Sequence, residues 1–211
     1  MKVNVLDTAL IQHELRVLRD VSTGGIAFRK GLQHLGRYFA YEIAKSFPRV
    51  ERDVSTPLDI AKGVFIEGLG RIVIVNVLRA AIPFVEGLLG VFFEARVGII
   101  SAFRSEAPPF CVKIDYVRVP NIEPEDTLIV ADPMVATGST MSGVLKELER
   151  FGAPKRTILA CILTTPMAIS RLEREFPGLL VYASAIDNEL NGRGYIVPGL
   201  GDAGDRAFLT L

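Results

Sequence analysis

The chain has 211 residues, 49% of them hydrophobic, and its 24 Lys and Arg residues are balanced by 24 Asp and Glu residues, for a formal net charge of +0. This length and composition suit one α/β domain, or a core with an appended subdomain, and allow a sizeable core. The neutral charge excludes the global basic field that draws a protein to nucleic acid. The two cysteines and two histidines form no metal-spaced cluster and exclude a disulfide framework.

Two helices are predicted near the N-terminus. Apolar residues recur at helical spacing over residues 8–19 and again over residues 26–47, and Gly24 and Gly25 interrupt the pattern between them. A short strand pair is expected around Gly63. The apolar character of the two helices suggests that the chain associates with copies of itself.

No targeting or membrane-spanning segment is expected. The start of the chain lacks the basic residues and apolar core of a signal peptide. The most apolar longer stretch, residues 80–100, contains a proline and several charged residues, which argue against a membrane span. We therefore predict a cytoplasmic protein.

Continuous apolar runs alternate with helical patterns through the rest of the chain. They predict strands over residues 71–78, 97–103, 127–132, 157–163 and 179–183, and helices over residues 80–93, 139–151 and 167–176. Such alternation is typical of an α/β fold with a parallel sheet covered by helices on both faces. Residues 104–120 differ, because two prolines precede an alternating pattern that predicts a hairpin flap projecting from the sheet.

Three polar residues are expected at one rim of this sheet. Ligands of parallel α/β folds bind beyond the carboxyl ends of the strands. Arg79, Arg104 and Asp132 each end a predicted strand. These side chains should therefore face a common crevice.

The segment from Leu128 to Thr140 carries the strongest functional signal. A buried strand ends at Asp132, and a loop of small residues with three hydroxyls leads into a helix. Such a loop can turn several backbone N–H groups toward one anion, and the helix N-terminus adds about half a positive charge. An acid before a phosphate cradle indicates a ligand such as a sugar phosphate. The loop is neither a Walker A sequence nor a dinucleotide fingerprint, and an ordinary strand–helix turn is an equal alternative for this loop alone.

The C-terminal segment from Gly194 to Arg206 is rich in glycine. Glycine permits positive φ angles and a close approach of the backbone to a ligand. The alternative is a loop that only covers the edge of the sheet. We expect this tail to be loop-rich.

Three separated segments resemble the uracil phosphoribosyltransferases, which are type I phosphoribosyltransferases. The segments are Asp132-Pro133-Met134-Val135-Ala136-Thr137-Gly138, Val77-Leu78-Arg79-Ala80-Ala81 and the tail from Gly194 to Arg206. The resemblance implies the type I fold, a parallel sheet core flanked by helices, with a protruding hairpin flap and a C-terminal hood. It also implies a single domain over residues 1–211, divided into N-terminal helices at about 8–47, a core at about 64–184 and a uracil-binding hood at about 185–211.

The resemblance implies an enzyme of pyrimidine salvage that converts uracil and 5-phospho-α-D-ribose 1-diphosphate (PRPP) to UMP and diphosphate with Mg²⁺. PRPP would carry the ion, and no side chain is expected to ligate it. The residues implied to contact PRPP are Arg79, Arg104, Asp132, Pro133, Met134, Val135, Ala136, Thr137, Gly138, Ser139, Thr140 and Asp202. Those implied to contact uracil are Ile196, Gly201, Asp202 and Ala203, and those implied to be catalytic are Asp132, Arg79 and Asp202.

The family pattern gives several of these residues a role. Arg79 and Arg104 would bind the diphosphate, because guanidinium forks match phosphate oxygens; a surface ion pair is the simpler alternative for an arginine. Asp132 would accept hydrogen bonds from ribose hydroxyls. Asp202 would approach PRPP and is a candidate acceptor for the uracil N1 proton. Tyr195 would pack on the base or only within the hood.

Two alternatives remain open at this stage. One is a phosphoribosyltransferase for another nucleobase, and the other is a PRPP- or nucleotide-sensing regulator that binds RNA on the same fold. The hood favours uracil, while the neutral charge and the intact Arg79 argue against the regulator. Ala81 and Ser139 depart from the family by standing where glycine is common. Members of the family form homodimers and homotetramers, and some respond to GTP or CTP; neither a nucleic acid nor a membrane partner is expected.

Overall fold

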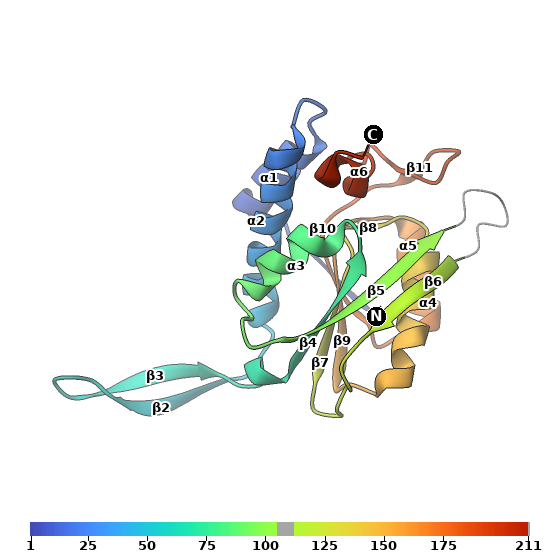
Figure 1. Cartoon of the computed structure of the whole chain (residues 1–211). Coiled ribbons are helices and arrows are strands. Elements are labelled where there is room, and N and C mark those ends of the chain that lie inside the picture. The colour runs from blue at the N-terminus through green and yellow to red at the C-terminus, as the bar shows by residue number, and fades with distance from the viewer. Residues whose placement is uncertain (105–111, 211) are drawn as a thin grey trace.

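The computed structural model describes residues 1–104 and 112–210, except for the side chain of Arg104. Within these residues a mostly parallel sheet forms the centre of the molecule (Figure 1). Its strands, in spatial order, are β1 (Lys2–Val5), β10 (Leu180–Ile186), β9 (Arg156–Thr164), β7 (Thr127–Ala131), β4 (Ile72–Leu78), β5 (Arg96–Arg104) and β6 (Val112–Arg118), with the short β8 (Met134–Val135) beside β9. The predicted α/β fold is confirmed.

Helices cover both faces of the sheet (Figure 1). One face carries α1 (Ala9–Arg19), α2 (Gly25–Ala44) and α3 (Ala81–Leu89), and the other carries α4 (Ser139–Leu148) and α5 (Pro166–Glu175). Side chains along β4 alternate between the two cores: Ile72 and Ile74 pack with the first group of helices, and Val73 and Val75 pack with the second. Burial on both faces explains why the strand sequences are continuously apolar.

The flap begins as predicted. β6 pairs antiparallel with β5 at the edge of the sheet, which is the arrangement expected for a hairpin. The tip of the predicted flap, residues 105–111, lies outside the described residues, as does Cys111. The other cysteine, Cys161, is fully buried in β9, as expected for a small apolar side chain.

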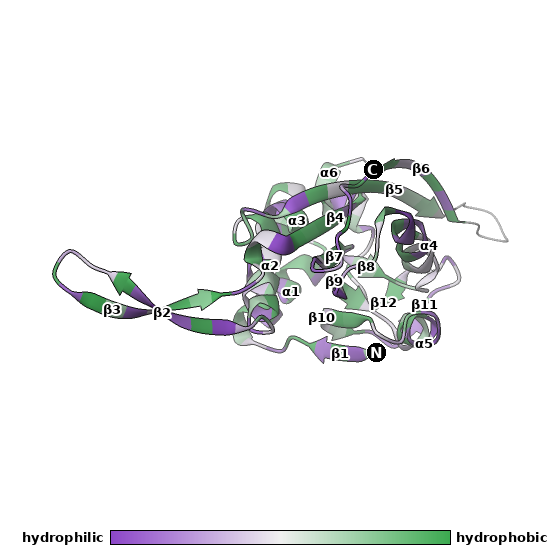
Figure 2. Cartoon of the chain, turned by 90° about the horizontal axis from the view of Figure 1, so that it is seen from below, coloured by the Kyte–Doolittle hydropathy of each residue, from purple (hydrophilic) through white to green (hydrophobic). Residues whose placement is uncertain are grey.

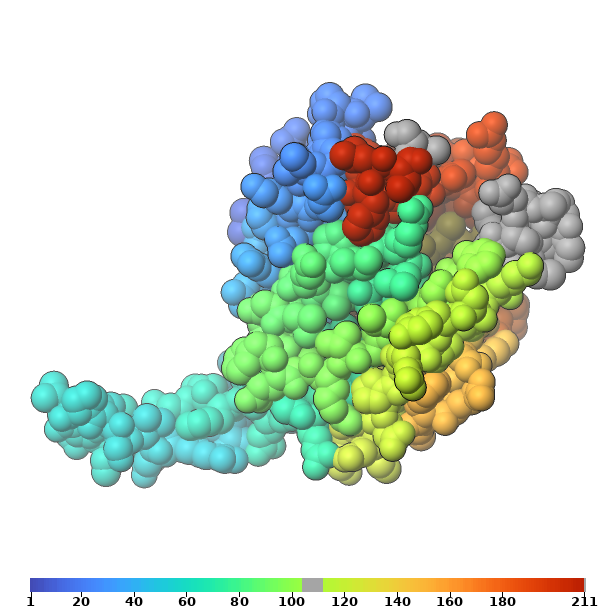
Figure 3. All heavy atoms as spheres, viewed as in Figure 1, coloured from blue at the N-terminus to red at the C-terminus, as the bar shows by residue number. Residues whose placement is uncertain are grey.

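A second hairpin is longer and more exposed than the short strand pair that the sequence predicts. It consists of β2 (Arg49–Ser55) and β3 (Ile60–Ile66), which pair antiparallel along their whole length. The hairpin projects from the body as an isolated arm (Figure 3). Hydrophobic stretches lie along both of its strands (Figure 2). We call residues 49–66 the arm.

Several helix and strand ends differ from the prediction. The helix expected over 80–93 stops at Leu89, where Gly90 caps it, and α4 stops at Leu148 before a 3-10 turn, Glu149–Phe151. A second 3-10 turn, Leu69–Arg71, precedes β4. Strand β1 was not predicted, because four residues are too few to establish a period; it forms by pairing with β10.

The tail contains more regular structure than expected. It holds a small hairpin of β11 (Glu189–Leu190) and β12 (Ile196–Val197) and a helix, α6 (Ala203–Phe208). The prediction of a loop-rich tail was wrong for α6, whose first residues lie in a glycine-rich sequence. The side chain of Asp202 starts this helix by accepting a hydrogen bond from the Asp205 N–H. α6 lies against α2, so the C-terminal helix packs on an N-terminal helix (Figure 1).

No helix in the described part of the chain is both long enough and apolar enough to cross a membrane.

A pair of glycines sets the contact between α2 and α3. A Cβ atom added at Gly36 would lie 2.0 Å from the Phe84 carbonyl oxygen, and one added at Gly87 would lie 2.0 Å from the Gln33 carbonyl oxygen. The two backbones therefore touch directly. This contact fixes the position of α3, which begins just beyond Arg79.

We predict that Gly36→Ala lowers the free energy of unfolding by about 1–3 kcal/mol, because the new methyl group forces the two helices apart. Thermal unfolding followed by circular dichroism measures the change. Gly178→Ala is the matched control, since no atom lies within 4 Å of a Cβ at that position. Equal melting temperatures for the two variants would contradict the prediction.

Candidate functional site

Arg79 and Asp132 lie at the same rim of the sheet, as the sequence predicts. Arg79 follows β4 and Asp132 follows β7, and these two strands are parallel neighbours. Both residues line a cavity of about 240 Å³. The rest of its wall is formed by Val77, Leu78, Ala80, Ala102, Phe103, Met134, Val135, Ala136, Thr137, Gly138, Thr140, Met141 and Gly194. We call this space the first cavity.

The loop before α4 has the backbone geometry of an anion cradle. Gly138 adopts a left-handed conformation, with φ of 74°, and a Cβ atom there would lie 3.1 Å from the Ala168 Cα. Glycine is therefore required on both conformational and steric grounds. Gly138 is also the N-cap of α4 and has no side chain to bond the first N–H groups of the helix. Those N–H groups face the loop and suit an anion.

Hydroxyl groups organise the same loop. Thr165 donates a hydrogen bond of 2.6 Å to the Ala136 carbonyl, which ties the loop to the start of α5. The hydroxyls of Thr137 and Ser139 lie 2.8 Å apart. These contacts hold the loop before any ligand binds, so its donors are preorganised.

Asp132 is a half-buried carboxyl group. Its Oδ1 accepts a hydrogen bond of 3.1 Å from the Met134 N–H. No ion pair to Asp132 is found among the side chains of residues 1–103 and 112–210. Burial raises the pKa of Asp132 to about 7, although the Met134 hydrogen bond acts in the opposite direction. A carboxyl group that changes charge near neutral pH at the wall of a cavity is typical of a functional site.

Arg79 makes an ion pair that the sequence did not predict. Its Nη2 lies 3.0 Å from Oδ1 of Asp205 in α6, and the same oxygen accepts a hydrogen bond of 2.6 Å from the Thr210 hydroxyl. The Arg79 side chain is 55% exposed. Ion pairs this exposed contribute little free energy, so an anionic ligand can replace the Asp205 carboxylate at little cost.

A second cavity, of about 190 Å³, adjoins the first. Its walls are Ala80, Met134, Ala136, Gly194, Tyr195, Ile196, Gly201, Asp202, Ala203 and Gly204. The residues common to both cavities are Ala80, Met134, Ala136 and Gly194. Small side chains and exposed backbone dominate this wall, which suits a flat ligand read by main-chain groups. We call this space the second cavity.

The cavities contain most of the predicted site residues. Every predicted uracil contact lines the second cavity, and Tyr195 lies there too. Of the predicted PRPP contacts, Pro133 and Ser139 flank the first cavity without lining it. Arg104 ends β5, but its side chain lies outside the described residues. Asp202 lies in the second cavity, where its Oδ1 is occupied by the Asp205 N–H at 2.9 Å.

Larger hollows exist at the opposite edge of the sheet. Two cavities of about 410 and 480 Å³ share Lys155 and Arg156 and lie near the amino ends of β7 and β9. They contain none of the predicted site residues. Because ligands of parallel α/β folds bind at the carboxyl ends of the strands, the two smaller, joined cavities are the better candidate site.

Known proteins of one family resemble this chain over almost its whole length. Residues 5–210 match the model of the uracil phosphoribosyltransferase family. The chain is 50% identical over 202 residues to a uracil phosphoribosyltransferase from Thermococcus gammatolerans, an alignment that covers 96% of this chain and 90% of the relative. It is 48% identical over 211 residues to a uracil phosphoribosyltransferase from Pyrobaculum arsenaticum, with 100% of both chains covered.

Two solved structures share the fold of this chain. A protein from Aquifex aeolicus superposes with a TM-score of 0.90 at 31% identity, covering 99% of this chain and 98% of that chain. A hypoxanthine-guanine phosphoribosyltransferase from Bacillus anthracis has a TM-score of 0.50 at 21% identity and covers 79% of this chain and 83% of its own. At 21% identity, the similarity to the Bacillus anthracis enzyme shows a common fold and nothing more.

We predict that Asp132→Asn makes the ligand-free protein more stable than the parent at pH 8 but not at pH 4. The folded-state pKa of Asp132, about 7, exceeds its usual value of 3.8. Between these values the folded chain holds a proton that the unfolded chain has lost, so the parent's free energy of unfolding falls as the pH rises. The amide removes this loss, which we expect to be roughly 1–3 kcal/mol after solvent screening.

Chemical denaturation of parent and variant at several pH values measures this difference. Asp7→Asn serves as the control, because Asp7 is exposed. A stability difference between Asp132→Asn and the parent that does not change with pH would refute the prediction.

Proposed function

Because the chain belongs to the uracil phosphoribosyltransferase family, we propose that the two joined cavities are its active site, with PRPP in the first and uracil in the second. The chain is an enzyme, a pentosyltransferase of pyrimidine salvage, and its reaction forms UMP and diphosphate from uracil and PRPP. The observation that supports this placement most directly is the shared wall of the cavities. A bond formed between two ligands requires that their sites meet.

The loop before α4 is the proposed site of the 5-phosphate of PRPP. Its backbone N–H groups and the hydroxyls of Thr137, Ser139 and Thr140 suit a phosphate dianion. The left-handed Gly138 allows the chain to curve around that group. Because the loop is already held by Thr165, little reorganisation accompanies binding.

Arg79 is proposed to bind the diphosphate, which is the leaving group. As the bond from ribose C1 to the diphosphate breaks, negative charge builds up on the diphosphate and the ribose gains oxocarbenium character. A guanidinium that meets this charge lowers the barrier. Uracil N1 then attacks C1 from the opposite face. The exposed pair with Asp205 at 3.0 Å would hold Arg79 in the substrate-free enzyme and open when the diphosphate arrives.

Asp132 is proposed to accept hydrogen bonds from the ribose hydroxyls. It follows β7 and lines the same cavity as Arg79 and the loop before α4. Hydroxyl donors stabilise the ionised carboxylate, which opposes the effect of burial. Asp202 stays a candidate acceptor for the uracil N1 proton through its Oδ2 atom, because its Oδ1 bonds the Asp205 N–H.

Mg²⁺ fits this cavity as an ion that PRPP brings. Among the described residues, no group of three His, Cys, Asp or Glu side chains is placed to hold a metal. Mg²⁺ commonly binds through one or two carboxylates together with substrate phosphates, and the first cavity offers the single carboxylate of Asp132. The ion would supply positive charge at the departing diphosphate.

Uracil is proposed to lie flat in the second cavity. Ile196 is buried and apolar, and Tyr195 is half exposed at the same wall. The backbone at Gly201 and Ala203 offers fixed donors and acceptors to the edge of the pyrimidine. Recognition by main-chain hydrogen bonds suits a small, planar base with few polar atoms.

The arm supports a homo-oligomer. Leu58, Ile60 and Val64 are 98, 66 and 64% exposed on it, and an isolated two-stranded hairpin is only marginally stable in water. Packing against a second copy would cover these side chains. We therefore propose a homodimer, or a homotetramer built from it. The expected GTP or CTP effectors, the cytoplasmic location and the division of one domain into helices, core and hood stay predictions.

We predict that the purified protein forms UMP from uracil, PRPP and Mg²⁺ in a spectrophotometric assay. Cytosine, hypoxanthine and orotate should give little product. Arg79→Ala should lower kcat/KM for PRPP by about 10²-fold or more, because a donor to the leaving group is lost. The affinity for UMP should change much less, since UMP carries no diphosphate.

Arg71→Ala is the matched control for Arg79→Ala. Arg71 lies at the opposite end of β4, where it pairs with Glu123. Its replacement should leave kcat/KM for PRPP and the affinity for UMP near those of the parent. Absence of UMP formation under every nucleotide addition would contradict the activity. Equal losses of PRPP use and UMP affinity in Arg79→Ala would contradict the role of that residue.

We predict that the double variant Leu58→Lys/Val64→Lys has a smaller molar mass in solution than the parent, because the charges prevent the arm from packing on another copy. Sedimentation equilibrium measures the mass. Val21→Lys, which changes a residue that is 95% exposed outside the arm, should leave it unchanged. A monomeric parent, or an unchanged mass for the double variant, would rule out assembly through the arm.

A further inference from the structure

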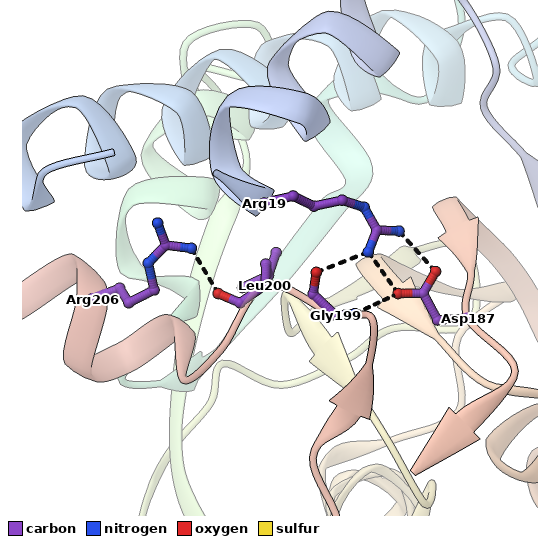
Figure 4. A network of polar contacts seen from close by, with 5 residues as sticks. All are labelled: Arg19, Asp187, Gly199, Leu200 and Arg206. Atoms are coloured by element: carbon purple, nitrogen blue, oxygen red, sulfur yellow. Dashed lines mark hydrogen bonds and ion pairs between the residues drawn. The ribbon is translucent and has the colours of Figure 1, made fainter. Parts of the chain in front are cut away.

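Two arginines bind consecutive carbonyl groups of the turn that enters α6 (Figure 4). Arg19 Nη1 donates to the Gly199 carbonyl at 2.8 Å, and Arg206 Nη1 donates to the Leu200 carbonyl at 2.7 Å. The next residue, Gly201, lines the second cavity. The orientation of these peptide groups is therefore set immediately before the place where the base is proposed to bind.

The geometry of a peptide bond links the Leu200 carbonyl to the Gly201 N–H. The bond between these residues is trans, and a trans peptide holds its C=O and N–H in opposite directions. Because Arg206 draws the carbonyl toward α1, the Gly201 N–H points away from α1. No hydrogen bond from this N–H to another described residue is found. A fixed donor without a protein acceptor is available to a ligand in the second cavity.

We propose that Arg19 and Arg206 are positioning residues for base recognition, which fix the main chain so that Gly201 presents its N–H to uracil. The inference rests on the proposed placement of uracil in the second cavity. Neither arginine lines that cavity, so each acts through the backbone and not by touching the base. One of the two residues, Arg19, lies in α1, and the other, Arg206, lies in α6.

Arg19 and its ion-pair partner Asp187 together bind both backbone polar groups of Gly199. Its guanidinium forms a bidentate pair with Asp187, with both distances 2.7 Å, and Asp187 is only 7% exposed. Asp187 Oδ2 in turn accepts the Gly199 N–H at 2.9 Å. The N–H and the C=O of Gly199 are therefore both bound by one ion pair (Figure 4). Planar bidentate geometry of this kind is specific to arginine.

Arg206 connects the turn to the end of α1. Besides the Leu200 carbonyl, its guanidinium donates to the carbonyls of Leu18 and Asp20, the latter at 2.6 Å. The group also stacks over the Phe28 ring, 4.3 Å from its centroid. Several donors in a rigid plane are needed to make these contacts together. A lysine ammonium, which is a single point of charge on a flexible stem, cannot reproduce them.

The test compares Arg206→Lys and Arg19→Lys with the matched control Arg29→Lys. Arg29 also donates to a hood carbonyl, that of Ala207, at 2.5 Å, but it lies beyond the turn. We expect each of the first two variants to raise KM for uracil about tenfold or more, with KM for PRPP and kcat within about twofold of the parent. Arg29→Lys should leave all three constants unchanged.

If the two arginines only stabilised the fold, their replacement would change KM for uracil, KM for PRPP and kcat together. If KM for uracil and KM for PRPP rise in parallel, or if Arg29→Lys produces the same split, the inference is overturned. If a thermal melt shows that Arg206→Lys is not folded, Arg19→Lys decides the question, because the substitution at position 19 leaves the contacts of Arg206 intact.

A further variant separates this inference from the proposed site. Ala203→Val narrows the second cavity directly and should raise KM for uracil. An unchanged KM for uracil in Ala203→Val would overturn the placement of the base and the inference with it. A raised value in Ala203→Val, together with unchanged values in both arginine variants, would overturn the positioning role alone.

Discussion

Parallel pairing of β4 with β7 places the residues that follow these strands at the same edge of the sheet. Arg79 and Asp132 are neighbours for this reason, although more than fifty residues separate them along the chain. Both strands are buried on their two faces, so their ends have little freedom to shift. The cationic and acidic sides of the first cavity are therefore held in register by the hydrophobic core.

The second cavity depends on a different kind of interaction. Most of its wall comes from residues 194–204 of the C-terminal segment, which contribute no strand to the central sheet. Guanidinium groups bonded to backbone carbonyls fasten this segment to α1. The proposed active site thus combines an edge fixed by packed strands with a cover fixed by directional polar contacts. In the proposed arrangement, uracil would lie where these two parts meet, beside the wall shared by the cavities.

Local patterns were sufficient to predict many of the residues that line the two cavities. The strand ends, the loop before α4 and the family resemblance singled out Arg79, Asp132 and the residues proposed to contact uracil, because each lies within a short recognisable segment. Asp205, which pairs with Arg79 across 126 residues, and Arg19, which reaches Gly199 across 180 residues, were not assigned any role. No local pattern reports such contacts, since they join segments that lie far apart in the sequence. Helix α6 was missed for a different reason: it has only six residues, one of them Gly204, which are too few to establish a helical period.

The contacts between α1 and the hood have a consequence for the order in which the molecule takes shape. They join residues separated by 180 or more positions, and loops of that length close late, after their entropy cost has been offset by more local contacts. The sheet and the phosphate loop can form from residues already made by position 190. A nascent chain would therefore complete the proposed phosphate-binding loop first. It would complete the proposed base-binding cavity only when the C-terminal residues have been synthesised.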